Sequence, residues 1–493
     1  MCEERVTQRG SRQFRACFAL LGWRNWRTMP ARVRSFLAAA GALLTAGLAF
    51  GSAAGEGMRG DALPLPSAAP RLERAPLAPT RADCQRLAPP PPVPRPPAPF
   101  GLATLADRGG RGMNHFYAAL SQAAVGRGLA RIMYFGDSHV ASDLMTGRIR
   151  HTLQSRFGDG GVGFFLPSRP VRWYAHADID MGRSAGWDVL AVRKSHDLER
   201  RVGPAGFALF THGEADAAVR LHAAEIVPKP SNRTAQLQVY YLQQPAGGHV
   251  RAIIDGSESR LWTTASEGMV ETPGYFETAL RRMPQRLEIN AVGDGPVTLY
   301  GMTLERSTSG VVLDTLGIPG ARAKDHLLWD DEIYREHMIR REPDLVVLAY
   351  GTNEGTDSEP IETFESNLRH VVSRVRETVP QASCLLVGPT DHPQRVGRSY
   401  RLRKRTGQIV EAERRIAAEH ACGFIDLVSV MGGPMSMMRI VAARFAGPDH
   451  THLTRRGYEA LADAISGAVV TGWSGWQRTA CTDKRDEAVL NAN

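Results

Sequence analysis

The feature that most constrains the fold is an alternation of short apolar runs and amphipathic helical patterns in two separate parts of the chain. The first part has helical spacing over 114–126, an apolar run over 130–139 and a second helical pattern starting near Leu144. In the second part, apolar runs over 311–320, 343–354, 382–390 and 422–428 alternate with helical patterns over 362–378 and 401–421 and after Thr454. Strands joined by helices of about 15 to 20 residues favour right-handed crossovers. We therefore predict a parallel sheet in a three-layer α/β/α domain.

A different pattern separates these two parts. From about Phe165 to Ser309, short runs such as AVRLHAA, AQLQVYYLQQ and RLEINAVG alternate apolar and polar residues, and turn sequences such as PAGG and GDGP divide them. This pattern is typical of antiparallel strands. We predict an inserted β-sandwich over 167–310, which divides the α/β domain into 102–166 and 311–475. Residues 476–493 are polar and lack apolar spacing, so we expect a frayed C-terminal tail.

The N-terminal region has the features of an export or anchoring signal. The uncharged stretch FLAAAGALLTAGLAFGSAA follows several arginines, so we predict a transmembrane anchor or a cleaved signal peptide over 36–55, with a basic cytosolic segment over 1–35. Both alternatives remain open, and both send the rest of the chain across a membrane. Residues 56–101 include PPPPVPRPPAPF, which predicts an extended, semi-rigid linker. We therefore expect a periplasmic or cell-envelope location.

The charge argues against nucleic acid as a partner. Residues 1–60 hold nine Arg and three Glu, or +6 of the total +9, which leaves +3 for residues 61–493. A nearly neutral body lacks the concentrated positive field that phosphate binding needs.

The cysteines argue against a thiolate metal site. The six cysteines include no C-x-x-C pair, so we expect no thiolate-bound zinc. Cys384 and Cys422 begin neighbouring predicted strands and are candidates for a disulfide in an oxidising compartment, although buried free thiols are the favoured interpretation.

Three residues have the chemistry of a nucleophile, a base and an orienting acid. Ser138 lies between an apolar strand and a helix, where a serine is also a common helix cap. Asp449 and His452, spaced D-x-x-H in PDHTHLT, come just before the last helix, and a carboxylate at this spacing orients an imidazole. The neighbouring His450 is interpreted as a surface residue.

Two further residues are candidate donors to an oxyanion. Asn353, in YGTNE, follows the strand LVVLAY, and Gly320, in GIPG, offers a backbone N–H where any side chain would crowd an ester oxygen. An Asx turn and a turn glycine are the alternatives when each residue is taken singly. The order of all these residues along one α/β pattern favours an acyl-transfer site at the carboxyl edge of the sheet.

The four stretches GDSH, GIPG, YGTNE and DHTH resemble, in order, the four conserved blocks of the SGNH (GDSL-type) hydrolases. The resemblance covers 102–166 and 311–475 and implies that family's α/β/α, flavodoxin-like fold. It implies Ser138 as nucleophile, His452 as general base and Asp449 as its partner. It also implies an oxyanion hole formed by the N–H groups of Ser138 and Gly320 and the amide of Asn353, with neither metal nor cofactor.

Two departures point to a subgroup. His139 stands where the family usually has Leu, and Thr352-Asn353-Glu354 replaces the commoner Gly-Asn-Asp. With RFGDGGVG and the long β insertion, the region around Ser138 is similar to bacterial peptidoglycan O-acetylesterases of the Ape type, whose inserted domain resembles a carbohydrate-binding module. This resemblance implies an acetylated polysaccharide, peptidoglycan above all, as the substrate.

Several alternatives stay open. An O-acetyltransferase would use the same site, a polysaccharide-binding protein would keep the triad without using it, and a lipase or thioesterase would differ only in its acyl pocket. The sequence leaves the oligomeric state open. We expect the GDGGVG stretch to be a loop and most aromatic residues of the insertion to pack in its core, with sugar stacking as the alternative for Trp173, Tyr174, Tyr240, Tyr241, Trp262 and Tyr275.

Overall fold

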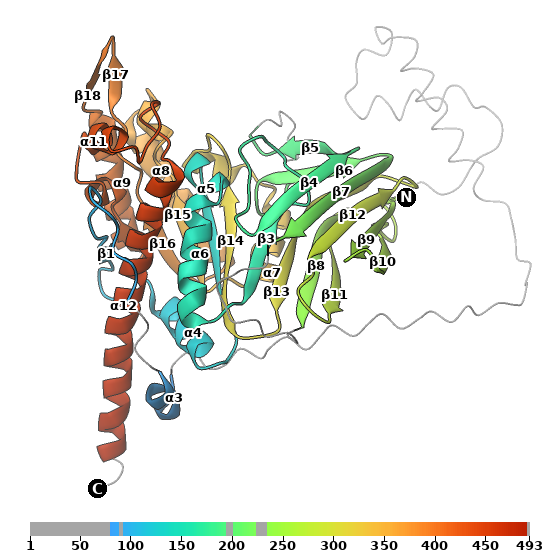
Figure 1. Cartoon of the computed structure of the whole chain (residues 1–493), viewed down its shortest axis with the longest axis horizontal. Helices are drawn as coiled ribbons and strands as arrows, with labels where there is room; N and C mark the ends of the chain where they lie inside the picture. Colours follow the sequence, from blue (N-terminus) through green and yellow to red (C-terminus); the bar gives the residue numbers. More distant parts are fainter. Residues whose placement is uncertain (1–78, 88–91, 194–200, 223–233, 491–493) are drawn as a thin grey trace, which may run out of the picture. The chain divides into compact units, whose positions relative to one another are not determined.

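A six-stranded sheet forms the centre of the α/β domain. The computed structural model describes residues 79–87, 92–193, 201–222 and 234–490, apart from the side chains of 483–490 (Figure 1). The strand order is β14 (Gly310–Gly317), β2 (Leu129–Gly136), β15 (Leu345–Ala349), β16 (Ser383–Val387), β19 (Gly423–Ile425) and β1 (Leu105–Ala106). All neighbours are parallel except β1 and β19.

Alternate side chains of the central strand β2 enter two different cores, because successive residues of a strand point to opposite faces. Ile132 and Tyr134 face a core shared with one helical layer, whereas Met133 and Phe135 face the core of the other layer. The first layer contains α4 (Asn114–Ala124), α6 (Leu144–Phe157) and α12 (Arg455–Leu490); the second contains α7 (Asp331–Arg341), α8 (Ile361–Thr378) and α9 (Lys404–Glu419). The predicted three-layer fold is confirmed, with α7 as an unpredicted helix.

The predicted β-sandwich is also present. One sheet contains β10 (Glu258–Thr263), β9 (His249–Ile254), β12 (Arg286–Val292), β7 (Glu214–Leu221) and β4 (Ile179–Ala185). The other contains β11 (Thr272–Leu280), β8 (Ala235–Gln243), β13 (Val297–Arg306), β6 (Phe207–Thr211) and β5 (Asp188–Ala191), and β3 (Gly161–Phe165) pairs with β13. An apolar core fills the space between the two sheets. The glycine-rich stretch 158–163 therefore ends in a strand, where we expected only a loop.

The sandwich packs directly against the α/β domain. Tyr240 and Tyr300 belong to the same core as strands β2 and β15, and their rings surround His337 of α7. Burial lowers the pKa of His337 to about 3, so this histidine is neutral and packs as an aromatic ring. Most aromatic side chains of the insertion pack in this way, but Trp173 is 66% exposed, with the Arg172 guanidinium over its ring.

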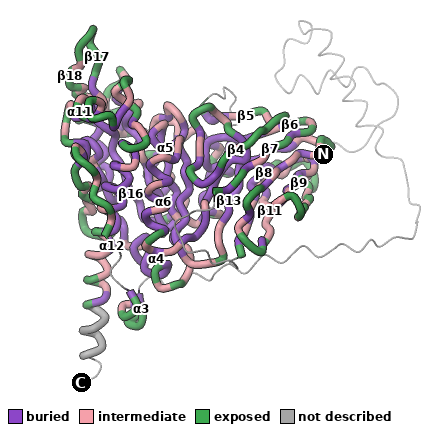
Figure 2. Tube along the Cα trace, in the orientation of Figure 1, coloured by how far each residue is buried: buried purple, intermediate pink, exposed green. Residues whose placement is uncertain are grey.

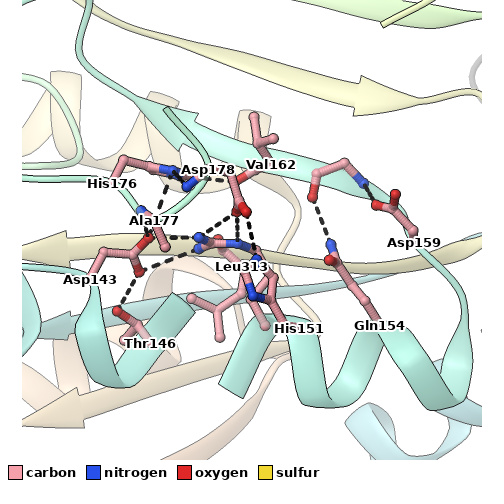
Figure 3. A network of polar contacts seen from close by, with 12 residues as sticks. Asp143, Thr146, His151, Gln154, Asp159, Val162, His176, Ala177, Asp178 and Leu313 are labelled. Atoms are coloured by element: carbon pink, nitrogen blue, oxygen red, sulfur yellow. Dashed lines mark hydrogen bonds and ion pairs between the residues drawn. The ribbon is translucent and has the colours of Figure 1, made fainter. Parts of the chain in front are cut away.

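A buried network of charged residues joins α6 to the start of the insertion (Figure 3). The Arg150 guanidinium donates to Asp143 at 2.6 Å and to Asp178 at 2.8 Å, and His151 bonds the other oxygen of Asp178. Burial opposes ionisation of both carboxyls, but the charge of Arg150 outweighs it and lowers their pKa values. Asp143 also accepts from the backbone N–H of Ala177, which fixes the insertion next to α6.

The cysteines and the C-terminal region differ from the prediction. Cys384 and Cys422, expected to be free thiols, form a disulfide between neighbouring strands, and Cys84 and Cys481 form a second one. The expected frayed tail is wrong, because α12 continues to Leu490. The Cys84–Cys481 disulfide holds the helix within the expected tail, and just before that tail Trp473 is buried against Phe157 and donates to Ser121.

The end of the predicted linker is attached to the α/β domain. Residues Arg81–Arg86 form a short helix, α3, with the Cys84–Cys481 disulfide beside it. Phe100 is buried against Phe445. The predicted segments 1–35 and 36–55 lie outside the described residues. Among the residues that are described, no helix is both long and apolar enough to span a membrane.

Candidate active site

Three neighbouring strands end at the same level at one edge of the central sheet. Gly136 at the end of β2 pairs with Gly317 of β14 on one side and with Ala349 of β15 on the other. The chain leaves β2 toward β14 and later returns to β15 on the opposite side, which makes this edge a topological switch point. Ser138, Gly320 and Asn353 each follow one of these strands within a few residues, so the fold brings the three sequence blocks together.

Ser138 occupies a sharp turn. It is the first residue of the single-turn helix α5 (Ser138–Ala141), and the Asp137 side chain caps that turn by accepting from the His139 N–H. A Cβ at Gly136 would lie 2.5 Å from Val140 and 2.9 Å from the Ala349 carbonyl oxygen, so only glycine allows this close approach. The long helix α6 begins after Asp143, at the Leu144 near which the sequence predicted it.

Asp449, His452 and Ser138 form a continuous hydrogen-bonded chain. The His452 Nδ1 lies 2.7 Å from the Asp449 carboxylate, and its Nε2 lies 3.0 Å from the Ser138 Oγ. An ionised carboxylate only accepts, so Nδ1 carries the proton and Nε2 accepts from the serine. Burial raises the pKa of Asp449, but hydrogen bonds from His452 and Thr451 outweigh this and lower it overall. The His452 and Asp449 side chains are 49% and 51% exposed, so the site is open to solvent.

The two other candidate donors lie in the loops beside Ser138. Gly320 has a φ of 75°, which favours glycine, and a Cβ there would meet the Arg193 guanidinium at 2.7 Å. Glycine is therefore favoured at this position by its backbone conformation and by the nearby Arg193 side chain, whereas we expected that a side chain here would crowd the substrate. The Asn353 amide donates to the Ala321 carbonyl at 2.9 Å and to Asp137 at 3.3 Å. Within the described residues, the backbone N–H groups of Ser138 and Gly320 have no hydrogen-bond partner.

Glu354 connects the two loops that hold these donors, a role the sequence did not reveal. Its carboxyl accepts from the Ala323 N–H at 2.6 Å and from the Gly351 N–H at 3.0 Å. Burial raises the pKa of Glu354 to about 7. Glu413 is buried nearby, and burial raises its pKa as well. The only sequence signal was the departure Thr352-Asn353-Glu354 from the commoner family block.

His139 lies beneath the triad formed by Ser138, His452 and Asp449. It stands at the position where the SGNH (GDSL-type) hydrolases usually have Leu. Its Nδ1 is 3.0 Å from the Tyr458 hydroxyl and its Nε2 is 3.4 Å from the Thr390 hydroxyl. The ring lies 5.6 Å from that of His452, and burial lowers the pKa of His139. A neutral imidazole held at both nitrogens supports the turn without adding a charge beside the base. Among the described residues, no group of three or more His, Cys, Asp or Glu is arranged to hold a metal ion.

The comparisons with known proteins agree with this architecture. Residues 277–460 match the GDSL-like lipase/acylhydrolase family. This match includes Gly320, Asn353, Asp449 and His452. It does not include Ser138, because the match begins at residue 277. This part of the chain is therefore similar to a GDSL-like lipase/acylhydrolase domain.

One solved structure extends the likeness beyond residues 277–460. A structure titled "Peptidoglycan O-acetylesterase in action, 5 min" is 21% identical and superposes with a TM-score of 0.63, covering 76% of this chain and 99% of that one. A family two carbohydrate esterase from Cellvibrio japonicus is 12% identical, with a TM-score of 0.25, and covers 59% of this chain and 99% of that one. No curated protein matches in sequence. The TM-score of 0.63 shows that this chain and the O-acetylesterase share one fold.

Proposed function

We propose that this protein is a serine esterase of the GDSL type that removes O-acetyl groups from a cell-wall polysaccharide, with peptidoglycan as the substrate. The observation that supports it most is the hydrogen-bonded chain from Asp449 through His452 to Ser138 at an open sheet edge. The substrate is inferred from the shared fold of the peptidoglycan O-acetylesterase, which includes the insertion.

In the first step, the Ser138 oxygen bonds to the acetyl carbonyl carbon while its proton passes to the His452 Nε2. The negative charge on the carbonyl oxygen is stabilised by the N–H groups of Ser138 and Gly320 and by the Asn353 amide. The Asn353 hydrogen bond to Asp137 is longer than the one to Ala321, so we expect the bond to Asp137 to be the one exchanged. The sugar oxygen then leaves with the proton from His452.

In the second step, water replaces the sugar. His452 takes a proton from the water, the hydroxide attacks the acetyl carbon, and Ser138 recovers its proton as acetate leaves. The half-exposed triad favours water as acceptor, which supports an esterase over an O-acetyltransferase.

A cell-envelope location belongs to the same proposal. The two disulfides suit an oxidising compartment outside the cytosol. Segment 36–55 would then be either an anchor in the inner membrane or a cleaved signal peptide, and the part of the linker before the domain-bound helix Arg81–Arg86 would hold the enzyme away from the membrane surface.

The test compares the full chain with Ser138→Ala, using Ser142→Ala from the end of the same turn as the matched control. We expect Ser138→Ala to lose hydrolysis of p-nitrophenyl acetate and acetate release from O-acetylated peptidoglycan, while Ser142→Ala keeps both. Ester hydrolysis without acetate release from peptidoglycan would overturn the substrate but keep the mechanism. Full activity of Ser138→Ala would overturn the mechanism, whereas a wild-type protein that hydrolyses neither substrate would favour a polysaccharide-binding role.

A further inference from the structure

The connection between β16 and α9 carries an unusually basic hairpin. Residues 392–405 contain five Arg and one Lys and no acidic residue. Within this segment, β17 (Gln394–Val396) and β18 (Ser399–Arg401) form an antiparallel two-stranded ribbon. Figure 1 shows the two strands projecting at the top of the view, and Figure 2 shows that the ribbon is largely exposed.

The base of this hairpin is attached to both catalytic loops. On one side, the His392 Nε2 lies 3.3 Å from the Thr451 hydroxyl, between Asp449 and His452 in the sequence. On the other side, Arg403 donates to the Gly355 carbonyl at 3.1 Å, and Arg405 donates to the Glu354 carbonyl at 2.7 Å. The hairpin therefore projects between the loop that contains Asp449 and His452, which we call the triad loop, and the loop that contains Asn353.

The hairpin also contacts the triad loop above its base. The Tyr400 ring stacks on the His450 ring with centroids 4.0 Å apart and planes 28° apart. His450 adjoins Asp449, so the second strand of the hairpin lies beside the triad. The expected surface residue His450 is thus partly covered, and by this hairpin.

The charges on the hairpin are not neutralised by the protein. Arg395, Arg398 and Arg401 are exposed, and none of them forms an ion pair with any carboxylate in the described part of the chain. On the nearby helices α8 and α9, by contrast, Arg369 pairs with Glu419, and Arg414 with Asp426. An exposed group of like charges produces a local positive potential, and guanidinium groups bind carboxylates in a bidentate manner.

We propose that the hairpin 394–401 is a substrate-binding element that holds carboxylates of an acidic glycan strand while its acetyl group reaches Ser138. This inference rests on the proposed esterase function and narrows its substrate class. Peptidoglycan carries carboxylates on its peptides, whereas a neutral acetylated polysaccharide offers the arginines no partner. Val396 and Leu402, 42% and 50% exposed, add apolar contact beside the charges.

The test uses the full chain with Arg395→Gln, Arg398→Gln and Arg401→Gln combined. The matched control removes three exposed arginines from the insertion: Arg183→Gln, Arg220→Gln and Arg251→Gln. Acetate release is measured on O-acetylated peptidoglycan, on acidic acetylated alginate and on neutral acetylated xylan, together with p-nitrophenyl acetate hydrolysis.

We expect the hairpin variant to raise KM for the two acidic polymers about tenfold, because each exposed charge pair contributes modestly. Its kcat, its activity on p-nitrophenyl acetate and its KM for xylan should match those of the wild type. The effect should shrink as salt is added, since exposed charges are screened. The control variant should behave as the wild type on every substrate.

Three outcomes would overturn the inference: an unchanged KM on the acidic polymers, an equal rise on neutral xylan, or an equal effect of the control variant. Loss of binding to vesicles containing phosphatidylglycerol, with polymer kinetics unchanged, would instead assign the hairpin to a membrane surface. A wild-type enzyme that is inactive on peptidoglycan but active on alginate would overturn the proposed substrate while the hairpin is still tested on the acidic polymer.

Discussion

Two polar clusters of this protein are both built around aspartates but have different roles. At the carboxyl edge of the sheet, Asp449, His452 and Ser138 form a hydrogen-bonded chain that is half exposed. At the junction of α6 and the insertion, Asp143 and Asp178 hold Arg150 in a cluster that is almost fully buried. The first cluster is open to a substrate, and the second joins two parts of the fold.

The difference shows that residue chemistry alone does not identify a catalytic site. Both clusters place carboxylates against a cation or an imidazole, and both lower carboxyl pKa values. Only the edge cluster lies where strands end and where a substrate can reach the polar atoms. Substitutions in each cluster should therefore separate loss of activity from loss of stability.

Asp449→Asn should abolish most of the activity. The amide cannot hold the Nδ1–H tautomer of His452, so we expect kcat to fall by about 10⁴-fold. The melting temperature should stay close to that of the wild type, since the carboxylate is half exposed. Steady-state kinetics and thermal unfolding measure the two effects. A large loss of stability with little loss of kcat would erase the distinction between the clusters.

Arg150→Met should act in the opposite way. It leaves two buried carboxylates without their cation, so we expect the free energy of unfolding to fall by about 3–5 kcal/mol, as measured by urea denaturation. Activity of the protein that remains folded should be retained. Arg369→Met, which breaks a half-exposed pair with Glu419, is the control and should cost at most about 1 kcal/mol. A similar small cost for Arg150→Met would contradict the structural role of the buried cluster.

Glu354→Gln tests a case between the two, a buried carboxyl inside the active-site edge. Because its pKa is raised to about 7, the folded state keeps a proton that the unfolded state loses above its ordinary pKa of 4.5. The contribution of Glu354 to the free energy of unfolding therefore falls as pH rises through about 7. Relative to that of the wild type, the free energy of unfolding of Glu354→Gln should rise by about 2 kcal/mol between pH 5 and pH 8.

The same variant should also affect catalysis. An amide nitrogen cannot accept the hydrogen bond from one of the two loop N–H groups, so we expect kcat to fall about tenfold with KM nearly unchanged. Glu413→Gln removes a neighbouring buried carboxyl and should leave kcat as it is. Equal losses of kcat in both variants would show that Glu354 only contributes to packing.

His151→Gln should have the smallest effect. The side chain donates to Asp178 from a partly exposed position, so its loss should cost about 1 kcal/mol of stability. Urea denaturation of the variant beside Arg150→Met would rank the two partners of Asp178. A cost for His151→Gln as large as that for Arg150→Met would make the histidine, and not the arginine, the main partner.

Local patterns were enough to predict the strand–helix alternation and the insertion. In β2, side chains alternate between two cores, which appears in the sequence as the apolar run 130–139. The C-terminal helix was missed beyond residue 475, because a partner that stabilises it there is distant in sequence: Cys481 is bonded to Cys84. Periodicity contains no information about such partners.

The order of the elements and the residues that follow each strand could be read from the sequence. Backbone geometry makes this possible, since parallel strands place their carboxyl ends at one edge wherever they pair. Which polar groups share that edge became known from the folded structure. Glu354 bridges two loops, His139 lies under His452, and the basic hairpin contacts the triad loop through Tyr400, all by contacts between residues far apart in the chain. Such contacts depend on packing in three dimensions, which no local pattern encodes.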